Sequence, residues 1–145
     1  MMRLLVSLSL LVIAASCQVE PSEIYYGEDA CHFCKMTIVD RQHAAQVVTV
    51  KGKAFKYDAI ECMMNDLKQW DRPEVKFYLA NDYANPGELI DAREASFLIS
   101  EGIPSPMGEF LSAFSEGQDR SEALTEHGGT ALNWDQLRKE FQVHH

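Results

Sequence analysis

The spacing of hydrophobic positions predicts two small units that follow each other along the chain. In the first unit, runs rich in β-branched and aromatic residues predict strands over residues 36–39, 43–50, 54–57 and 75–79. Residues 51–53 have a glycine at their centre and predict a hairpin turn. Apolar residues then recur at helical spacing from Ile60 to Leu67. They predict a helix that begins at Asp58 and ends near Trp70.

Two acidic residues at the start of this helix have the spacing of a capping box, because Glu61 follows Asp58 by three positions. We therefore interpret both side chains as caps of the helix N-terminus. Met63 and Met64 lie on the apolar face of the helix, so we expect them in the core. Cys62 lies beside that face and is expected to be an inert buried thiol.

The second unit repeats the order of the first. Its pattern predicts strands over residues 96–99, 108–115 and 130–132, and helices over residues 119–129 and 133–141. Asn133 is the expected cap of the last helix. The order strand, strand, helix, strand therefore appears twice, which predicts an α+β fold of two small ββαβ-type halves. We place the first half at 29–80, a linker at 81–95, and the second half, with its terminal helix, at 96–145.

Charge and the N-terminal residues narrow the class of protein. The chain of 145 residues has a net charge of −9, which argues against binding nucleic acid. Its start resembles a bacterial lipoprotein signal, since a short apolar segment leads through small residues to Cys17; the alternative is an ordinary cleaved signal. We expect a lipoprotein signal peptide at 1–16, lipidation of Cys17 and a tether at 17–28. The protein would be anchored on the periplasmic side, and Gln18 after the cysteine favours the outer membrane.

The sequence CHFCKM at residues 31–36 contains two cysteines, a histidine and a methionine, all of which are potential metal ligands. In an extended segment Cys34 and Met36 would point to the same face, and a thiolate with a thioether selects Cu(I). Other interpretations remain open. Cys31 and Cys34 could be a redox pair, although such pairs open helices and the following residues favour a strand. The two cysteines could also be half of a zinc site, or could form a structural disulfide with each other or with Cys62.

A further soft ligand is expected from a turn in the second unit. Met107 lies between a proline and a glycine, where a methionine is expected to be exposed and free to bind. Cys31, His32 and His43 are additional candidates for the same site. No pattern of catalytic residues stands out, so we expect a binding protein rather than an enzyme.

Taken together, these motifs resemble the NosL family, the copper-binding lipoproteins that accompany nitrous-oxide reductase. The resemblance runs from about residue 27 to residue 137 and is carried by the segments CHFCKM, AAQVV, YDAIECM, SPMG, HGG and LNWDQL, in this order. It implies a fold of two ββαβ halves, similar to part of organomercurial lyase.

The resemblance also implies a monomer that binds one Cu(I). The ion would be passed on through a copper transporter or the machinery that matures nitrous-oxide reductase. Carried over to this sequence, the implied ligands are Cys34, Met36 and Met107. Lys35 stands where the family usually has a glycine, and it places a positive charge beside the site. Cys31 would be an extra ligand or would oxidise with Cys34.

Overall fold

The computed structural model describes residues 18–144, so the predicted signal peptide at 1–16 and the lipidation site Cys17 lie outside the described residues. The strands are β1 (Ala45–Thr49), β2 (Ala54–Tyr57), β3 (Val75–Asn81), β4 (Leu89–Asp91), β5 (Ser96–Ile99), β6 (Leu111–Phe114) and β7 (Thr130–Leu132). The helices are α1 (Ile60–Leu67), α2 (Gly117–His127) and α3 (Trp134–Glu140). No helix in this part of the chain combines the length and the apolar character needed to cross a membrane.

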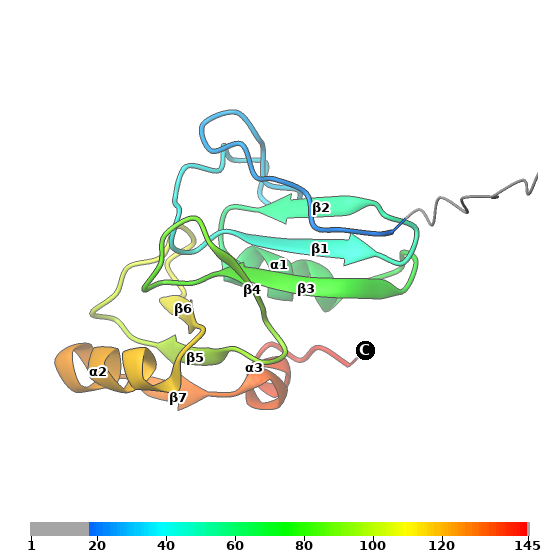
Figure 1. Cartoon of the computed structure of the whole chain (residues 1–145). Coiled ribbons are helices and arrows are strands. Elements are labelled where there is room, and N and C mark those ends of the chain that lie inside the picture. Colours follow the sequence, from blue (N-terminus) through cyan, green and yellow to red (C-terminus); the bar gives the residue numbers. More distant parts are fainter. Residues whose placement is uncertain (1–17, 145) are drawn as a thin grey trace, which may run out of the picture.

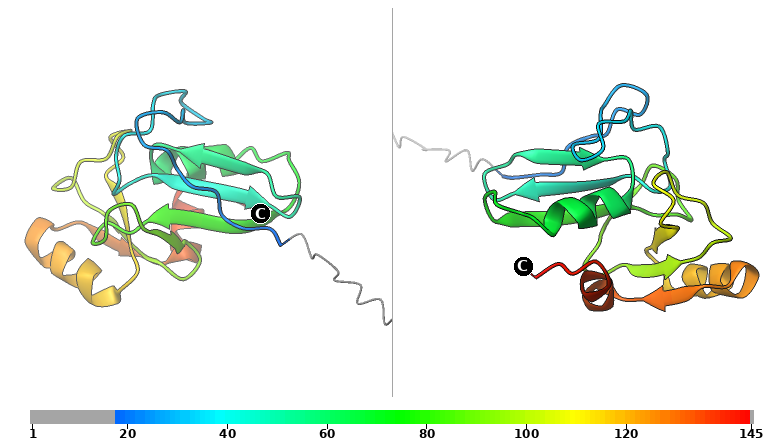
Figure 2. Two further views of the ribbon diagram at one scale, coloured as in Figure 1. Left: turned by 45° about the horizontal axis from the view of Figure 1, so that its top comes forward. Right: turned by 180° about the vertical axis from the view of Figure 1, so that it is seen from behind.

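The strands form two antiparallel sheets (Figure 1). The larger sheet has the order β2-β1-β3-β4, and the smaller has the order β6-β5-β7. Helix α1 lies against one face of the larger sheet, whereas α2 and α3 lie at opposite ends of the smaller one (Figure 1, Figure 2). The order ββαβ occurs once in each part of the chain, which confirms the predicted α+β class.

One continuous cluster of buried residues joins the two sheets. Val47 of β1 and Ile60 of α1 belong to the same cluster as Phe97 of β5, Leu111 of β6 and Leu137 of α3. Burial of one such side chain contributes about 1.5–3 kcal/mol to the free energy of unfolding. The two halves are therefore packed against each other, and the loops at their junction are held in place by a common core.

The structure differs from the predicted strands in several places. The strand predicted at 36–39 is wrong, because only Thr37 pairs there, in an isolated bridge with Ala30. Strand β6 begins later than predicted, since Phe110 before it has a left-handed φ of 62°. Strand β4 lies within the segment 81–95 that was predicted as a linker, and it pairs with β3 at the edge of the larger sheet.

Helix capping is as predicted at one helix and different at another. Asn133 caps α3 and forms a full capping box with Gln136. The prediction for α1 is wrong, because Ala59 is its N-cap residue and no side chain caps the helix. The carboxylate of Asp58 is directed instead toward thiol groups, and Glu61 is buried in the junction between the halves.

Candidate metal centre

The C-x-x-C sequence forms a closed loop rather than an extended segment. The backbone N–H of Cys31 donates to the carbonyl of Met36 at 2.7 Å, and that of Lys35 donates to the carbonyl of Cys31 at 3.0 Å. Lys35 has a left-handed φ of 68°, which turns the chain between Cys34 and Met36. The extended geometry that would place these two side chains on one face of a strand is therefore not present.

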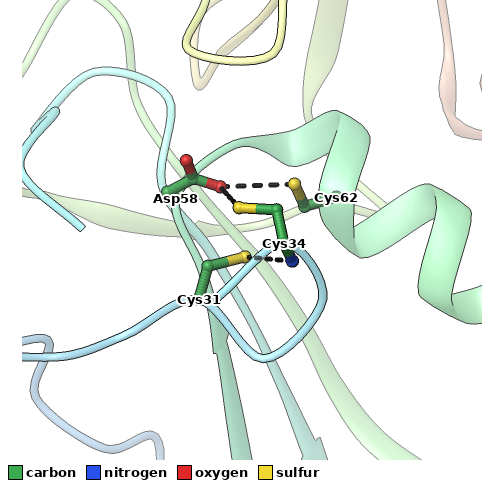
Figure 3. A group of neighbouring side chains, drawn as sticks. All are labelled: Cys31, Cys34, Asp58 and Cys62. Carbon is green, nitrogen blue, oxygen red and sulfur yellow. Dashed lines mark hydrogen bonds between the residues drawn. The ribbon is translucent and has the colours of Figure 1, made fainter. Parts of the chain in front are cut away.

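Asp58 and Cys62 approach this loop from the start of helix α1. A backbone hydrogen bond of 2.7 Å from His32 holds the loop against strand β2. Asp58 directly follows that strand, and Cys62 lies four positions later in the first turn of the helix, so both side chains meet the loop (Figure 3). One ligand atom from each of Cys31, Cys34, Asp58 and Cys62 lies within 4.8 Å of the others, and we call these four residues the thiol cluster.

Hydrogen bonds inside the thiol cluster distinguish its three sulfurs. Oδ1 of Asp58 accepts from Sγ of Cys34 at 3.3 Å and from Sγ of Cys62 at 3.2 Å. The sulfur of Cys31 is itself an acceptor, because the backbone N–H of Cys34 donates to it at 3.5 Å. The cluster thus contains a carboxylate that accepts from two thiols and a backbone donor for the third sulfur.

The three thiols differ in pKa because they interact with one another. The neighbouring thiol of Cys62 lowers the pKa of Cys31 to about 6 against the effect of burial, and the backbone N–H of Cys34 adds to the lowering. Burial raises the pKa of Cys34 to about 11. The neighbouring sulfur of Cys31 raises the pKa of Cys62, and burial acts in the same direction. Cys31 is therefore the first of the three to ionise, beside two protonated partners.

This set of donors suits a soft metal ion. Thiolates bind Cu(I) and Zn(II) well, whereas Ca²⁺ and Mg²⁺ require several oxygen ligands. Cys31 and Cys62 are each 1% exposed, whereas Cys34 is partly exposed. Cys34 is thus the sulfur that an ion arriving from solvent meets first. All three cysteines are free thiols in the structure.

The two candidate thioethers lie at the surface. Met36 is 56% exposed and Met107 is 39% exposed. Met107 lies in a tight turn, closed by the backbone N–H of Gly108, which donates to the carbonyl of Ser105 at 3.0 Å. The hydroxyl of Ser105 donates to the carboxylate of Glu61, so this turn is anchored to helix α1. Both methionines are therefore surface residues, and neither fills the core.

Neither candidate histidine is part of the thiol cluster. His43 is buried, and its ring nitrogens contact Oδ2 of Asp40 at 3.0 Å and Oγ of Ser112 at 3.2 Å. Both nitrogens of His43 therefore already have partners. The ring of His32 packs edge-on against Phe55, with the ring centroids 4.8 Å apart. These contacts give both histidines a structural role.

Sequence reasoning missed two residues of the thiol cluster, Asp58 and Cys62. It assigned the first to helix capping and the second to the core. A usable signal was present, because an acidic residue at the end of a strand is followed four positions later by a cysteine in the first turn of the next helix. Both side chains therefore lie at the junction of strand and helix, beside the loop that β2 holds.

The fold and the thiol cluster together define a small α+β domain with a thiol-rich group that could hold a metal ion. The chain belongs to the NosL family, whose model matches residues 24–142. This match confirms the resemblance found in the sequence motifs.

Two proteins illustrate the relationship. The chain is similar to the copper-binding lipoprotein NosL of Stutzerimonas stutzeri, with 26% identity over 124 residues that cover 78% of this chain. It spans 64% of the length of that relative. Its fold is similar to the crystal structure of the copper chaperone NosL from Shewanella denitrificans, with a TM-score of 0.71 and 21% identity. That similarity covers 81% of this chain and 95% of the other.

Proposed function

We propose that this protein is a periplasmic, membrane-tethered carrier of Cu(I). The observation that carries the proposal is the thiol cluster, in which three cysteine sulfurs and one carboxylate lie within 4.8 Å of one another. Thiolates are among the ligands that Cu(I) prefers. The names of the two similar proteins, a copper-binding lipoprotein and a copper chaperone, support the same metal. The proposed role is transfer of the ion rather than catalysis.

Cys34, Met36 and Met107 are the proposed ligands at the surface. Cys34 is the partly exposed thiol of the cluster, and the two methionines are exposed at the surface. A thioether is neutral and binds Cu(I) more weakly than a thiolate does, so this set favours release as well as capture. A partner that offers more thiolates could then remove the ion.

The proposed location and partners follow from the N-terminal sequence and the family. Lipidation of Cys17 would attach at least two acyl chains, and two chains are sufficient for stable anchoring. The proposed membrane is the outer membrane. The globular part would work as a monomer. Copper would arrive from a membrane transporter and pass to the machinery that matures nitrous-oxide reductase. The name lipoprotein, carried by the relative from Stutzerimonas stutzeri, supports the anchor.

A thiol-disulfide oxidoreductase fits the loop geometry less well. Reactive C-x-x-C pairs are activated when the first cysteine lies at a helix N-terminus. Here the pair lies in a turn that continues into left-handed Lys35, and the next helix begins only at Ile60. The geometry of the pair therefore favours binding of a metal ion between the loop and the helix.

An anaerobic titration of reduced, unlipidated protein tests the proposal. The protein competes for Cu(I) with a chromogenic chelator, and we expect one Cu(I) per chain. Met36→Ala and Met107→Ala should weaken the binding. Met64→Leu is the matched control, because it replaces a fully buried thioether of α1 with a side chain of similar volume. A parent protein that leaves all the Cu(I) on the chelator would disprove the function.

A further inference from the structure

We infer that Cu(I) in this protein moves between two positions that share Cys34. The outer position is the surface set that Cys34 makes with Met36 and Met107. The inner position, which we call the inner set, is formed by Cys34 with Cys31 and Cys62. This inference rests on the proposed copper-carrier function and states where the carrier stores its ion.

The sulfur positions of the inner set suit a three-coordinate ion. A metal–sulfur bond of about 2.3 Å places three ligand sulfurs roughly 4 Å apart at the corners of a triangle. In the structure the sulfurs of Cys31, Cys34 and Cys62 all lie within 4.8 Å of one another. Small side-chain rotations therefore close the triangle. Figure 3 shows the three sulfurs directed toward a common region between the loop and helix α1.

The loop directs a backbone donor at one ligand of the inner set. The sulfur of Cys31 accepts the backbone N–H of Cys34 at 3.5 Å. Such donors stabilise negative charge on sulfur, whether the sulfur is free or bound to a metal. A cysteine that served only as core packing would not require this donor. Its presence favours a ligand role for Cys31.

The ion moves inward by exchanging ligands while it stays bound to Cys34. When Cu(I) leaves the outer position, its bonds to the two thioethers break and its bond to Cys34 is kept. New bonds form to the sulfurs of Cys31 and Cys62, and any thiol proton is released to solvent as its sulfur binds the ion. Before the ion arrives, the thiol of Cys62 donates a hydrogen bond to the carboxylate of Asp58 at 3.2 Å. The copper stays Cu(I) throughout, so no electron donor or acceptor is needed.

Burial explains why the protein would use two positions. Cys31 and Cys62 are each 1% exposed, so an ion held there is shielded from oxidants and competing ligands. Met36 is 56% exposed and offers a route to solvent. The shared ligand, Cys34, is partly exposed and can remain bound in both positions. The inner set would hold the ion tightly, and the outer set would present it to a partner.

Serine variants of the inner cysteines test this inference. Cys31→Ser and Cys62→Ser remove a soft donor each, and the hydroxyl in Cys62→Ser can still donate to Asp58. Met63→Leu is the matched control, since it changes a fully buried sulfur next to Cys62. The measurements are Cu(I) competition and the ultraviolet thiolate-to-copper charge-transfer absorbance. Thermal unfolding verifies that each variant is folded, and Cys62→Ala replaces any serine variant that is not.

We expect both cysteine variants to bind one Cu(I) with at least about tenfold lower affinity than the parent and with weaker charge-transfer absorbance. Met63→Leu should match the parent in both. If the cysteine variants bind as tightly as the parent with unchanged absorbance, the inner set is overturned and the carrier function stands. If the parent binds no Cu(I), the proposed function fails and the inner set fails with it.

Discussion

Glu61 accepts a hydrogen bond from the hydroxyl of Ser105 and thereby joins helix α1 of the first half to a loop of the second half. The same Oε1 atom of Glu61 accepts the backbone N–H of Leu111 at 3.3 Å. Ser105 in turn accepts the backbone N–H of Phe110 at 2.9 Å. These three hydrogen bonds hold the loop that carries Met107 against the helix that contributes to the thiol cluster. The site therefore depends on contacts between the two halves of the chain.

Glu61→Ala should destabilise the fold and weaken Cu(I) binding through the loop. It leaves the buried N–H of Leu111 without its acceptor, which should lower the free energy of unfolding by about 1–3 kcal/mol. Urea unfolding measures this loss. It also frees the loop that carries Met107, so Cu(I) affinity should fall. In a Met107→Ala background the same change should have little further effect on affinity, because the ligand is already absent. An equal loss of affinity in both backgrounds would show that Glu61 does not act through Met107.

The free energy of unfolding should depend on pH through Glu61. Burial raises the pKa of this carboxyl, whereas an exposed glutamate in the unfolded chain titrates near about 4.3. Above that pH the unfolded state binds fewer protons than the folded state, so stability falls as pH rises through the folded-state pKa. Glu61→Gln cannot ionise and should lose this component. Urea unfolding of both proteins between about pH 5 and pH 8 measures it. Parallel pH profiles would contradict the assignment.

Asp58→Asn should make Cys34 more reactive. Burial raises the pKa of Cys34 to about 11, and its hydrogen bond to the Asp58 carboxylate acts in the same direction. An amide still accepts the hydrogen bond but carries no charge, so the pKa of the thiol should fall. We would measure the rate of iodoacetamide alkylation of the reduced protein as a function of pH. In the variant, the rate should begin to increase at a lower pH than in the parent. Asp119→Asn, a change at a partly exposed position of α2 far from the thiol cluster in sequence, is the control. Identical profiles for all three proteins would argue against the role of Asp58.

Lys35→Gly should stabilise the C-x-x-C loop. Lys35 has a φ of 68°, a conformation that costs a side-chain-bearing residue about 1–2 kcal/mol. Glycine adopts this φ freely but loses about 0.5–1 kcal/mol more in chain entropy on folding, so we expect a net gain of up to about 1 kcal/mol. Lys35→Ala keeps the strained backbone and should show no gain. A loss of stability in the glycine variant would mean that the contact of the lysine ammonium with the carbonyl of His32 outweighs the strain.

Elements whose partners are local were predictable from the sequence. The apolar spacing from Ile60 to Leu67 predicts α1, although the helix begins at Ile60 and ends at Leu67 rather than extending from Asp58 to near Trp70. Asn133 and Gln136 complete a capping box within one turn of α3. The glycine-centred turn at 51–53 joins β1 and β2 as predicted. In each case the interactions that form the element lie within a few positions of one another.

The site was harder to predict because its partners are distant in sequence. Asp58 has the spacing of a helix cap, yet its carboxylate accepts a hydrogen bond from Cys34, 24 positions earlier. A local pattern cannot show that contact, since it depends on how the loop folds over β2. The residues from Met36 to Val39 have the composition of a strand, but the preceding loop closes on itself and leaves them a single bridge. The role of Cys62 was hidden for the same reason.

Cu(I) competition by Cys34→Ser, measured anaerobically beside the parent and the methionine variants, tests the central claim most directly. Cys34 belongs to both proposed positions, so its loss should weaken Cu(I) binding more than the loss of any other single sulfur, by at least about a hundredfold. A Cys34→Ser protein that retains Cu(I) as tightly as the parent would contradict the account.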